Sequence, residues 1–195
     1  MPPGGYTWWY LDAVSDDGRQ ALVAIVFIGS VFSPYYAAAR RRAAARGGPA
    51  VADPEQHVAI NLALYGAGGS RWAMTERGQP QLQRNARELQ IGPSRMHWDG
   101  QSLVLDLDEW SLLPWPRRLR GRLRLQPQAL AEGGPRTLSS SGRHHWWPIA
   151  PSARMEVALD LPGWQWRGPA YLDSNRGDEP LEQGFRHWQW ARASL

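Results

Sequence analysis

Short apolar runs separated by tight-turn residues are the feature that most limits how this chain folds. The runs Tyr6–Ala13 and Ala21–Phe32 flank Asp17-Gly18, a dipeptide that favours a two-residue β-hairpin turn. A second pair of this kind, Asp99-Gly100, separates two further short apolar runs. Strands joined by such turns are antiparallel neighbours, so these positions predict an antiparallel sheet.

Two segments alternate apolar and polar residues, as strands with one buried face do. His57–Tyr65 has the pattern of a half-buried strand, and Leu119–Leu125 alternates leucine with arginine or glycine. The arginines therefore lie on the face opposite the leucines, which indicates a solvated strand face and not a nucleic-acid patch. The other predicted strands are Arg71–Glu76, Leu89–Ile91, Met96–Trp98, Leu103–Leu107, Trp146–Ile149, Ala153–Asp160 and Gly163–Arg167.

Little of the chain favours a helix. Ala37–Ala52 is rich in alanine and arginine, and Gly47-Gly48-Pro49 ends any helix there, so we expect a short helix or a mobile loop. Gln126–Gly142 is polar and is expected to be a long loop. The pattern as a whole predicts an all-β fold with little helix, an antiparallel barrel or sandwich, in one domain over residues 1–195.

One segment imitates a membrane helix. Ala21–Ala39 is uncharged for 19 residues and is followed by Arg40–Arg42. Its strongly apolar part, Ala21–Phe32, is too short for a bilayer core of about 30 Å, so we expect a buried strand. The N-terminus lacks a basic region followed by an apolar stretch, and a cytoplasmic location is expected.

Tryptophan is the unusual component of the composition. The chain has 12 Trp and only 3 Phe. An indole offers a large apolar face with one N–H donor, which suits a flat, apolar or π-rich ligand, although tryptophans also fill barrel cores.

Charge and chemistry-bearing residues exclude several classes of function. The net charge is +4, every basic residue is Arg, and most arginines are scattered among acidic residues, so no nucleic-acid partner is expected. The chain has no Cys, which removes disulfides and zinc-thiolate sites. His144 and His145 are adjacent and point to opposite faces of a strand, so we expect no metal site. No Gly-rich phosphate loop occurs, and no nucleotide cofactor is expected.

Two polar, aromatic stretches carry the candidate site. His144 and Trp146 lie two residues apart, as do Tyr171 and Asp173, so each pair shares one face of an extended strand. If the two faces converge, one site holds an imidazole, an indole, a phenol and a carboxylate. The alternative is that His144 is a barrel histidine with satisfied hydrogen bonds and that Asp173 caps a turn.

Several long blocks of the sequence resemble one known family. The blocks closely resemble carotenoid 1,2-hydratases, also called hydroxyneurosporene synthases, in the order of that family, and they are Gly4–Gly18, Phe27–Tyr36, His57–Gly66, Arg71–Gly78, His144–Pro151 and Gly168–Glu182. The resemblance implies cofactor-independent hydration of acyclic carotenoids such as neurosporene or lycopene on a lipocalin-like scaffold. Family members continue past the point matching Leu195 with a second β-rich portion.

The resemblance also implies a catalytic set. The family's His-x-Trp falls on His144 and Trp146, and its Tyr-x-Asp falls on Tyr171 and Asp173. Hydration needs an acid, a wall for a carbocation and a base. We assign the acid to Asp173, with a pKa raised by an apolar pocket, and expect Tyr171 to hold its carboxyl. Trp146 is the candidate cation wall and His144 the candidate base, although acid and base are interchangeable at this point.

The remaining aromatic residues and the arginines suggest where substrate and membrane bind. The residues expected to line a carotenoid path, or else the core, are Trp8, Trp9, Tyr35, Tyr36, Trp72 and Trp147. A carotenoid is far longer than a small barrel is wide, so we expect peripheral contact with the inner membrane, with Arg40–Arg42 against anionic lipid.

Two other classes of function stay open from the sequence. A non-catalytic lipocalin-like carrier suits the same tryptophan content. A carbohydrate-binding or carbohydrate-hydrolysing protein needs a second carboxylate about 5–10 Å from Asp173, for which Asp178 and Glu179 are candidates. The observation that separates enzyme from carrier is whether Asp173 and His144 face one pocket.

Overall fold

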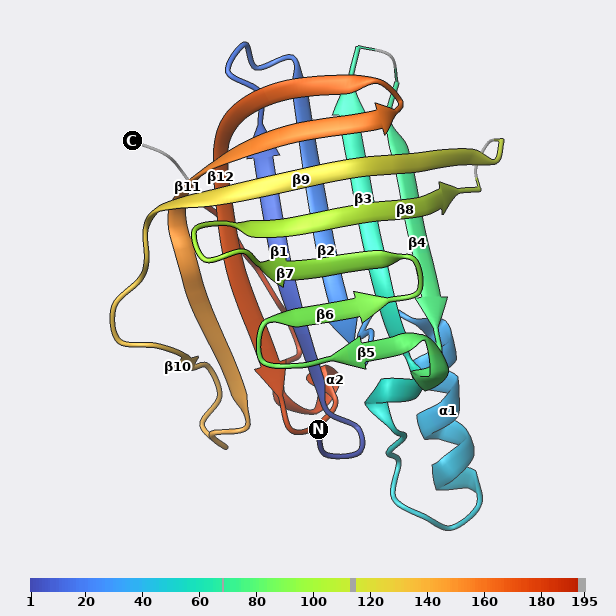
Figure 1. Cartoon of the computed structure of the whole chain (residues 1–195). Helices are drawn as coiled ribbons and strands as arrows, with labels where there is room; N and C mark the ends of the chain where they lie inside the picture. Colours follow the sequence, from blue (N-terminus) through green and yellow to red (C-terminus); the bar gives the residue numbers. More distant parts are fainter. Residues whose placement is uncertain (68, 113–114, 193–195) are drawn as a thin grey trace.

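Antiparallel strands make up most of the computed structural model, which describes residues 1–67, 69–112 and 115–192 (Figure 1). The strands are β1 (Tyr6–Val14), β2 (Gln20–Ile28), β3 (Val58–Gly66), β4 (Arg71–Arg77), β5 (Leu82–Arg84), β6 (Glu88–Ile91), β7 (Ser94–Trp98), β8 (Leu103–Ser111), β9 (Arg117–Ala129), β10 (Arg136–Thr137), β11 (His144–Leu161) and β12 (Trp164–Gly177). The helices are α1 (Pro34–Ala45) and α2 (Leu181–Gly184), with short 3-10 turns at Pro54–Gln56 and Gln79–Gln81.

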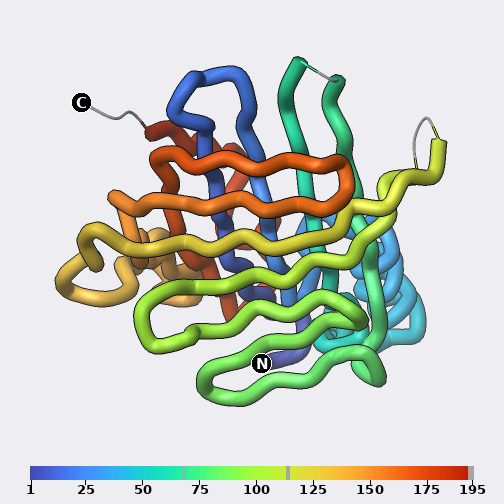
Figure 2. Tube along the Cα trace, turned by 45° about the horizontal axis from the view of Figure 1, so that its top comes forward, coloured from blue at the N-terminus to red at the C-terminus, as the bar shows by residue number. Residues whose placement is uncertain are grey.

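The strands of the described part form one sheet that curls into two crossed layers. Its order is β4-β3-β2-β1-β12-β11-β9-β8-β7-β6-β5, with β10 paired to β11. β1 to β4 run along one layer, and β5 to β9 cross in front of them (Figures 1 and 2). β11 and β12 belong to both layers because they bend from one into the other (Figure 1). The β11–β12 register shifts between Trp147 and Ala153, and β-bulges of this kind bend a strand.

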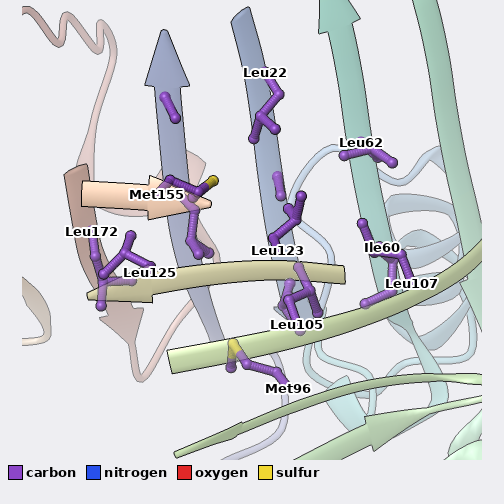
Figure 3. Packing of buried hydrophobic residues seen from close by; sticks show 14 of the residues in the cluster. Leu22, Ile60, Leu62, Met96, Leu105, Leu107, Leu123, Leu125, Met155 and Leu172 are labelled. Carbon is purple, nitrogen blue, oxygen red and sulfur yellow. The ribbon is translucent and has the colours of Figure 1, made fainter. Parts of the chain in front are cut away.

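The core lies between the two layers. Leu105 and Leu123 from the crossing layer face Leu22 and Leu62 from the other, and all four side chains are almost fully buried (Figure 3). Burying a leucine contributes about 1.5–3 kcal/mol. On β1 the side chains of Leu11 and Ala13 point into this core, so their neighbours on the strand point to the outer face of the layer.

The antiparallel, lipocalin-like barrel with little helix that the sequence predicts is confirmed. The alternating arginine strand is also confirmed: Leu119, Leu123 and Leu125 are buried in β9, while the arginines face outward, and Arg122 and Arg124 pair with Asp106 and Asp99. Arg118 binds Asp108 through two bonds of 2.7 and 2.6 Å.

Three boundaries in the N-terminal part differ from the prediction. The helix begins at Pro34 and not at Ala37, because the Ser33 hydroxyl caps it by accepting from the amides of the next turn, and it ends at Ala45. The strand predicted to reach Phe32 ends at Ile28, where Gly29 has φ +70°.

The C-terminal third contains longer strands than predicted. The two strands expected at Trp146–Ile149 and Ala153–Asp160 are one bent strand, β11. β12 continues to Gly177 through a stretch whose polar residues hide the strand pattern. The long loop expected from Gln126 is shorter, because β9 extends to Ala129 and β10 follows. In residues 1–67, 69–112 and 115–192 no helix is long and apolar enough to cross a bilayer.

Candidate active site

The candidate site lies on the outer face of the first layer, opposite the aliphatic core. On β12 the side chains of Tyr171, Asp173 and Asn175 share this face because they are two residues apart. β1 lies on one side of them, with Tyr10 paired to Asp173. β11 lies on the other side, with Trp146 paired to Asn175. The predicted convergence of Trp146, Tyr171 and Asp173 is therefore observed.

Asp173 is the centre of a hydrogen-bonded group. Its carboxyl is 2% exposed. The indole Nε1 of Trp146 and the hydroxyl of Tyr171 both donate to Oδ2, at 2.9 and 3.1 Å. Nδ2 of Asn175 donates to Oδ1 over 3.4 Å. One carboxyl oxygen thus accepts two firm hydrogen bonds, and the other accepts one long bond.

Burial raises the pKa of Asp173 to about 6, because the charged carboxylate loses its hydration. The hydrogen bonds from Trp146 and Tyr171 oppose this shift, and the negative charge of Asp12 adds to it. Burial, followed by the charge of Asp173, raises the pKa of the Tyr171 phenol, which stays neutral and donates. The site therefore holds a carboxylic acid that is protonated in part near neutral pH, as the sequence predicts.

His144 is fully buried, and both of its ring nitrogens have protein partners. Nδ1 lies 2.8 Å from the hydroxyl of Tyr6, and Nε2 lies 3.1 Å from a carboxylate oxygen of Glu179. In the register His144 is opposite Gly177, four residues beyond Asp173, which is about 13 Å along an extended strand. The structure does not bring His144 to Asp173.

Two glycines let the imidazole of His144 fit. A Cβ added at Gly177 would lie 2.8 Å from Nδ1, and one at Gly184 would lie 2.3 Å from Nε2. The ring of Phe185 packs edge-on at 4.9 Å. His144 thus joins β11 to β1 and to the turn that carries α2.

Residues 185–192, which we name the cover segment, lie over the outer face. The ring of Trp190 packs against Tyr10 at 5.1 Å and against Tyr171 at 5.6 Å. Arg192 forms an ion pair with Asp12 of β1, and its guanidinium lies 5.3 Å over the ring of Tyr171. The cover segment thus packs on Tyr171 and lines the cavity that contains Asp173.

Two cavities meet the cover segment. The first, of about 150 Å³, has Asp173 and Asn175 in its wall, and its other lining residues are Trp8, Tyr10, Ile25, Phe32, Trp188 and Trp190. The second, of about 580 Å³, lies along Trp146, Pro148 and Tyr171. Trp188 and Trp190 line both. Asp173 therefore faces an aromatic cavity that accepts an apolar group.

The site residues lie in a segment that matches a known family. The family described as Carotenoid hydratase CrtC matches residues 24–195. The chain belongs to this carotenoid hydratase family. A relative named acyclic carotenoid 1,2-hydratase, from Rubrivivax gelatinosus, is 56% identical to this chain. The alignment covers 100% of this chain and 46% of the length of the relative.

A second acyclic carotenoid 1,2-hydratase, from Thiocapsa roseopersicina, is 53% identical with the same coverage. The chain thus spans about half the length of the carotenoid hydratases it matches. A crystal structure of an AttH candidate from Nitrosomonas europaea has a TM-score of 0.55 at 12% identity, and the match covers 91% of this chain and 52% of the other. At that identity the likeness is one of fold.

The aromatic residues expected to bind the carotenoid separate into different places. Trp8 lines the first cavity. Trp9 follows Trp8 on β1, and Trp147 follows Trp146 on β11, so both side chains face the other side of the sheet. Trp9 packs there against the aliphatic core. Tyr36 is buried in α1 and donates to the carbonyl of Gly5 at 2.8 Å. Trp72 and Tyr35 are exposed and line an outer groove beside Trp110.

Four residues of the site were missed from the sequence. Tyr10 and Asn175 lie two residues from Trp8 and Asp173, so the alternation used for the other residues identifies them as well. Trp188 and Trp190 lie in a segment without strand or helix periodicity, where only the density of aromatic residues distinguishes them.

The structure also bears on the alternatives. Asp173 faces a cavity, whereas His144 is outside the walls of both cavities among the described residues. Asp178 is exposed. Glu179 is bound by Arg143 at 2.8 Å and by His144, so neither carboxylate lines the cavity of Asp173. Within the described ranges, no group of three or more His, Asp or Glu is placed to hold a metal ion.

Proposed function

We propose that residues 1–195 form one lipocalin-like β-domain that carries the catalytic site of an acyclic carotenoid 1,2-hydratase. The reaction adds water to the terminal C1–C2 double bond of a carotenoid such as neurosporene or lycopene, without a cofactor, and gives the 1-hydroxy product. The observation that supports it most is a buried carboxyl, Asp173, with a pKa of about 6, in the wall of an aromatic cavity.

Protonation of the alkene is the first step. Oδ2 of Asp173 already accepts from Trp146 and Tyr171, so the proton of the neutral acid resides on Oδ1. Trp146 and Tyr171 therefore orient the acid. Transfer of this proton to C2 leaves a tertiary cation at C1.

The aromatic walls of the first cavity stabilise that cation. Trp8 and Trp190 present indole rings next to Asp173. A desolvated cation over such a face gains about 2 kcal/mol or more. Because the indole of Trp146 is engaged through its N–H with the carboxyl, we assign the cation wall to Trp8 and Trp190 and not to Trp146 alone.

Water then forms the C1–O bond and gives up a proton. After the first step Asp173 is a carboxylate in the same cavity, so it accepts this proton and is regenerated as the acid. His144, with both nitrogens engaged, acts as a positioning residue that holds Tyr6 and Glu179.

Peripheral membrane contact is part of the proposal, because the substrate dissolves in lipid. Of the three arginines expected at the membrane, Arg40 pairs with Glu182, while Arg41 and Arg42 are exposed. We place the contact at the cytoplasmic face of the inner membrane. Co-sedimentation with anionic vesicles, lost on replacing Arg41 and Arg42 with Gln, tests it; equal binding to neutral vesicles contradicts the role of the arginines.

The test of function is incubation of the chain with lycopene or neurosporene in detergent, followed by analysis for the 1-hydroxy product. Asp173→Asn is expected to lose at least about 100-fold in rate, because it removes the transferable proton. Asp178→Asn, which changes an exposed carboxylate just past the end of β12, is the control and is expected to keep wild-type activity. Tight binding of carotenoid without product indicates a carrier, and near-normal hydration by Asp173→Asn contradicts the role of Asp173.

A further inference from the structure

Asn175 is a buried amide beside the proposed acid. It is 4% exposed and lies on β12 between Trp8 of β1 and Trp146 of β11 in the sheet register. Its side chain is in the wall of the same cavity of about 150 Å³ that contains Asp173.

The hydrogen bonds of this amide are incomplete. Nδ2 donates to Oδ1 of Asp173 over 3.4 Å. Oδ1 of Asn175 is buried and has no hydrogen-bond partner among the described residues. Buried side-chain oxygens nearly always have a donor, either from protein or from water.

Protein donors line the cavity at Trp8, Tyr10, Trp188 and Trp190, but none of them forms a hydrogen bond with this oxygen. Apart from Asp173 and Asn175, its lining residues are aromatic or, at Ile25, aliphatic. A water molecule occupies about 30 Å³ of liquid volume, so the cavity has room for a water together with the end of an apolar chain. The donor that the oxygen of Asn175 lacks is one that water supplies.

We infer that Asn175 is a further catalytic residue, whose Oδ1 binds the water molecule that becomes the hydroxyl group of the product. The inference rests on the proposed hydratase function. It places the nucleophile next to Oδ1 of Asp173, the oxygen that has just lost its proton.

Asp173 and Asn175 together account for every bond and proton of the hydration. The O–H bond of the Asp173 acid breaks as the C2–H bond forms from the alkene electrons. The water held by Asn175 gives an oxygen lone pair to C1, which forms the C–O bond. One O–H bond of the resulting oxonium breaks, and its proton returns to the Asp173 carboxylate. No other reactant is consumed.

If Asn175 binds the water, a variant at this position should keep proton transfer to C2 and lose the addition of water to C1. In Asn175→Leu, which has a similar shape and no oxygen, Asp173 still protonates C2, and the cation returns to alkene by losing a proton. In D₂O we expect the hydration rate to fall about 100-fold, the scale for losing one polar group that acts in a transition state. Deuterium exchange at C2 of recovered carotenoid is expected to stay within about threefold of wild type.

Two further variants separate catalysis from structure. Asn175→Ser keeps an oxygen and leaves room for an additional water, so it is expected to restore part of the hydration. Arg176→Gln changes the adjacent, exposed residue whose side chain points to the other face, and it is expected to keep both rates. Equal loss of exchange and hydration in Asn175→Leu, or hydration within threefold of wild type, overturns the inference.

A readout independent of activity is a crystal structure of the chain and of Asn175→Leu. The expected result is an ordered water about 2.7–3.2 Å from Oδ1 of Asn175 in the wild type that is absent from the variant. An active wild type with no water at Asn175 overturns this inference alone. An ordered water in a chain that forms no product overturns the proposed function instead.

Discussion

The two faces of the layer that contains β1 and β12 are built from the same alternating strands, yet they differ in chemistry. The inner face presents Leu11, Ala13 and Leu172 to an aliphatic core closed by the second layer. The outer face presents Trp8 and Asp173, and the cover segment and Phe32 pack over it. The inner face stabilises the fold by packing aliphatic side chains between the two layers. The outer face holds the titratable carboxyl of Asp173 beneath the aromatic side chains of the cover segment.

This difference means that, in the proposed hydratase, stability and catalysis depend on separate sets of residues. The buried carboxyl of Asp173 costs stability when it is charged, and the aliphatic core compensates for that cost. Changes to the inner face are therefore expected to unfold the protein, whereas changes to the outer face alter activity and pH dependence.

The largest expected effect is on the inner face. Leu123→Ala empties part of the core between the layers, where Leu123 is fully buried, and should lower the free energy of unfolding by about 2–5 kcal/mol. Urea denaturation followed by circular dichroism measures it. Leu130→Ala, at an exposed leucine, should change it by less than about 0.5 kcal/mol. Similar losses for both leucines would remove the distinction between the faces.

The second effect is the pH dependence of stability that Asp173 causes. Its pKa rises from 3.8 to about 6 on folding, so its neutral form is favoured in the native state. The native state therefore loses stability as pH rises through about 6, by about 3 kcal/mol at 1.36 kcal/mol per unit. The difference in unfolding free energy between wild type and Asp173→Asn, measured from pH 4 to pH 8, should change by most of this amount, because the loss begins at the unfolded pKa of 3.8. A difference that does not vary with pH contradicts the burial of Asp173.

A smaller effect is expected where the cover segment is attached. Gly184→Ala places a methyl group 2.3 Å from Nε2 of His144, which packs too tightly to move away, and should cost about 1–3 kcal/mol. Gly48→Ala is the control, because its Cβ meets only a backbone oxygen at 3.4 Å. Thermal denaturation compares the two. Equal melting temperatures for Gly184→Ala and Gly48→Ala would contradict the tight packing of Gly184 against His144.

The smallest effect is expected in the cover segment itself. Trp190→Ala admits water to Asp173, so the carboxyl pKa should fall by about one unit with little change in the unfolding transition. The alkaline limb of the pH–rate profile should move to lower pH by the same amount, and the loss of the Trp190 indole from the cation wall should lower the rate at every pH. Trp98→Ala, in β7 of the other layer, should leave the profile unchanged. A profile unmoved by Trp190→Ala would show that the cover segment does not set this pKa.

Much of the fold was predictable because its strands and turns are local patterns. The Asp17-Gly18 turn joins β1 and β2, which pair as expected. The two-residue spacing of Tyr171 and Asp173 also placed both on one face. These predictions rely on neighbours in the sequence, and the backbone geometry of a strand is enough to support them.

The features that the sequence did not predict depend on the register between strands and on the packing of a segment whose sequence has no strand or helix period. Which carboxylate reaches His144 is decided by the pairing of β11 with β12, and that pairing makes Glu179, not Asp173, its partner. The cover segment binds the sheet through the rings of Phe185, Trp188 and Trp190 and not through a strand ladder, so no period reveals it. Trp9 was grouped with Trp8 although adjacent side chains on a strand face opposite sides.

In the proposed hydratase, the end of the carotenoid binds on the outer, aromatic face and not in the aliphatic core. A crystal structure of Asp173→Asn soaked with an acyclic carotenoid tests it most directly, because this variant binds substrate without consuming it. The expected result is a terminal double bond in the cavity of Trp8 and Trp190, beside residue 173. A polyene between the two layers, against Leu105 and Leu123, would contradict it.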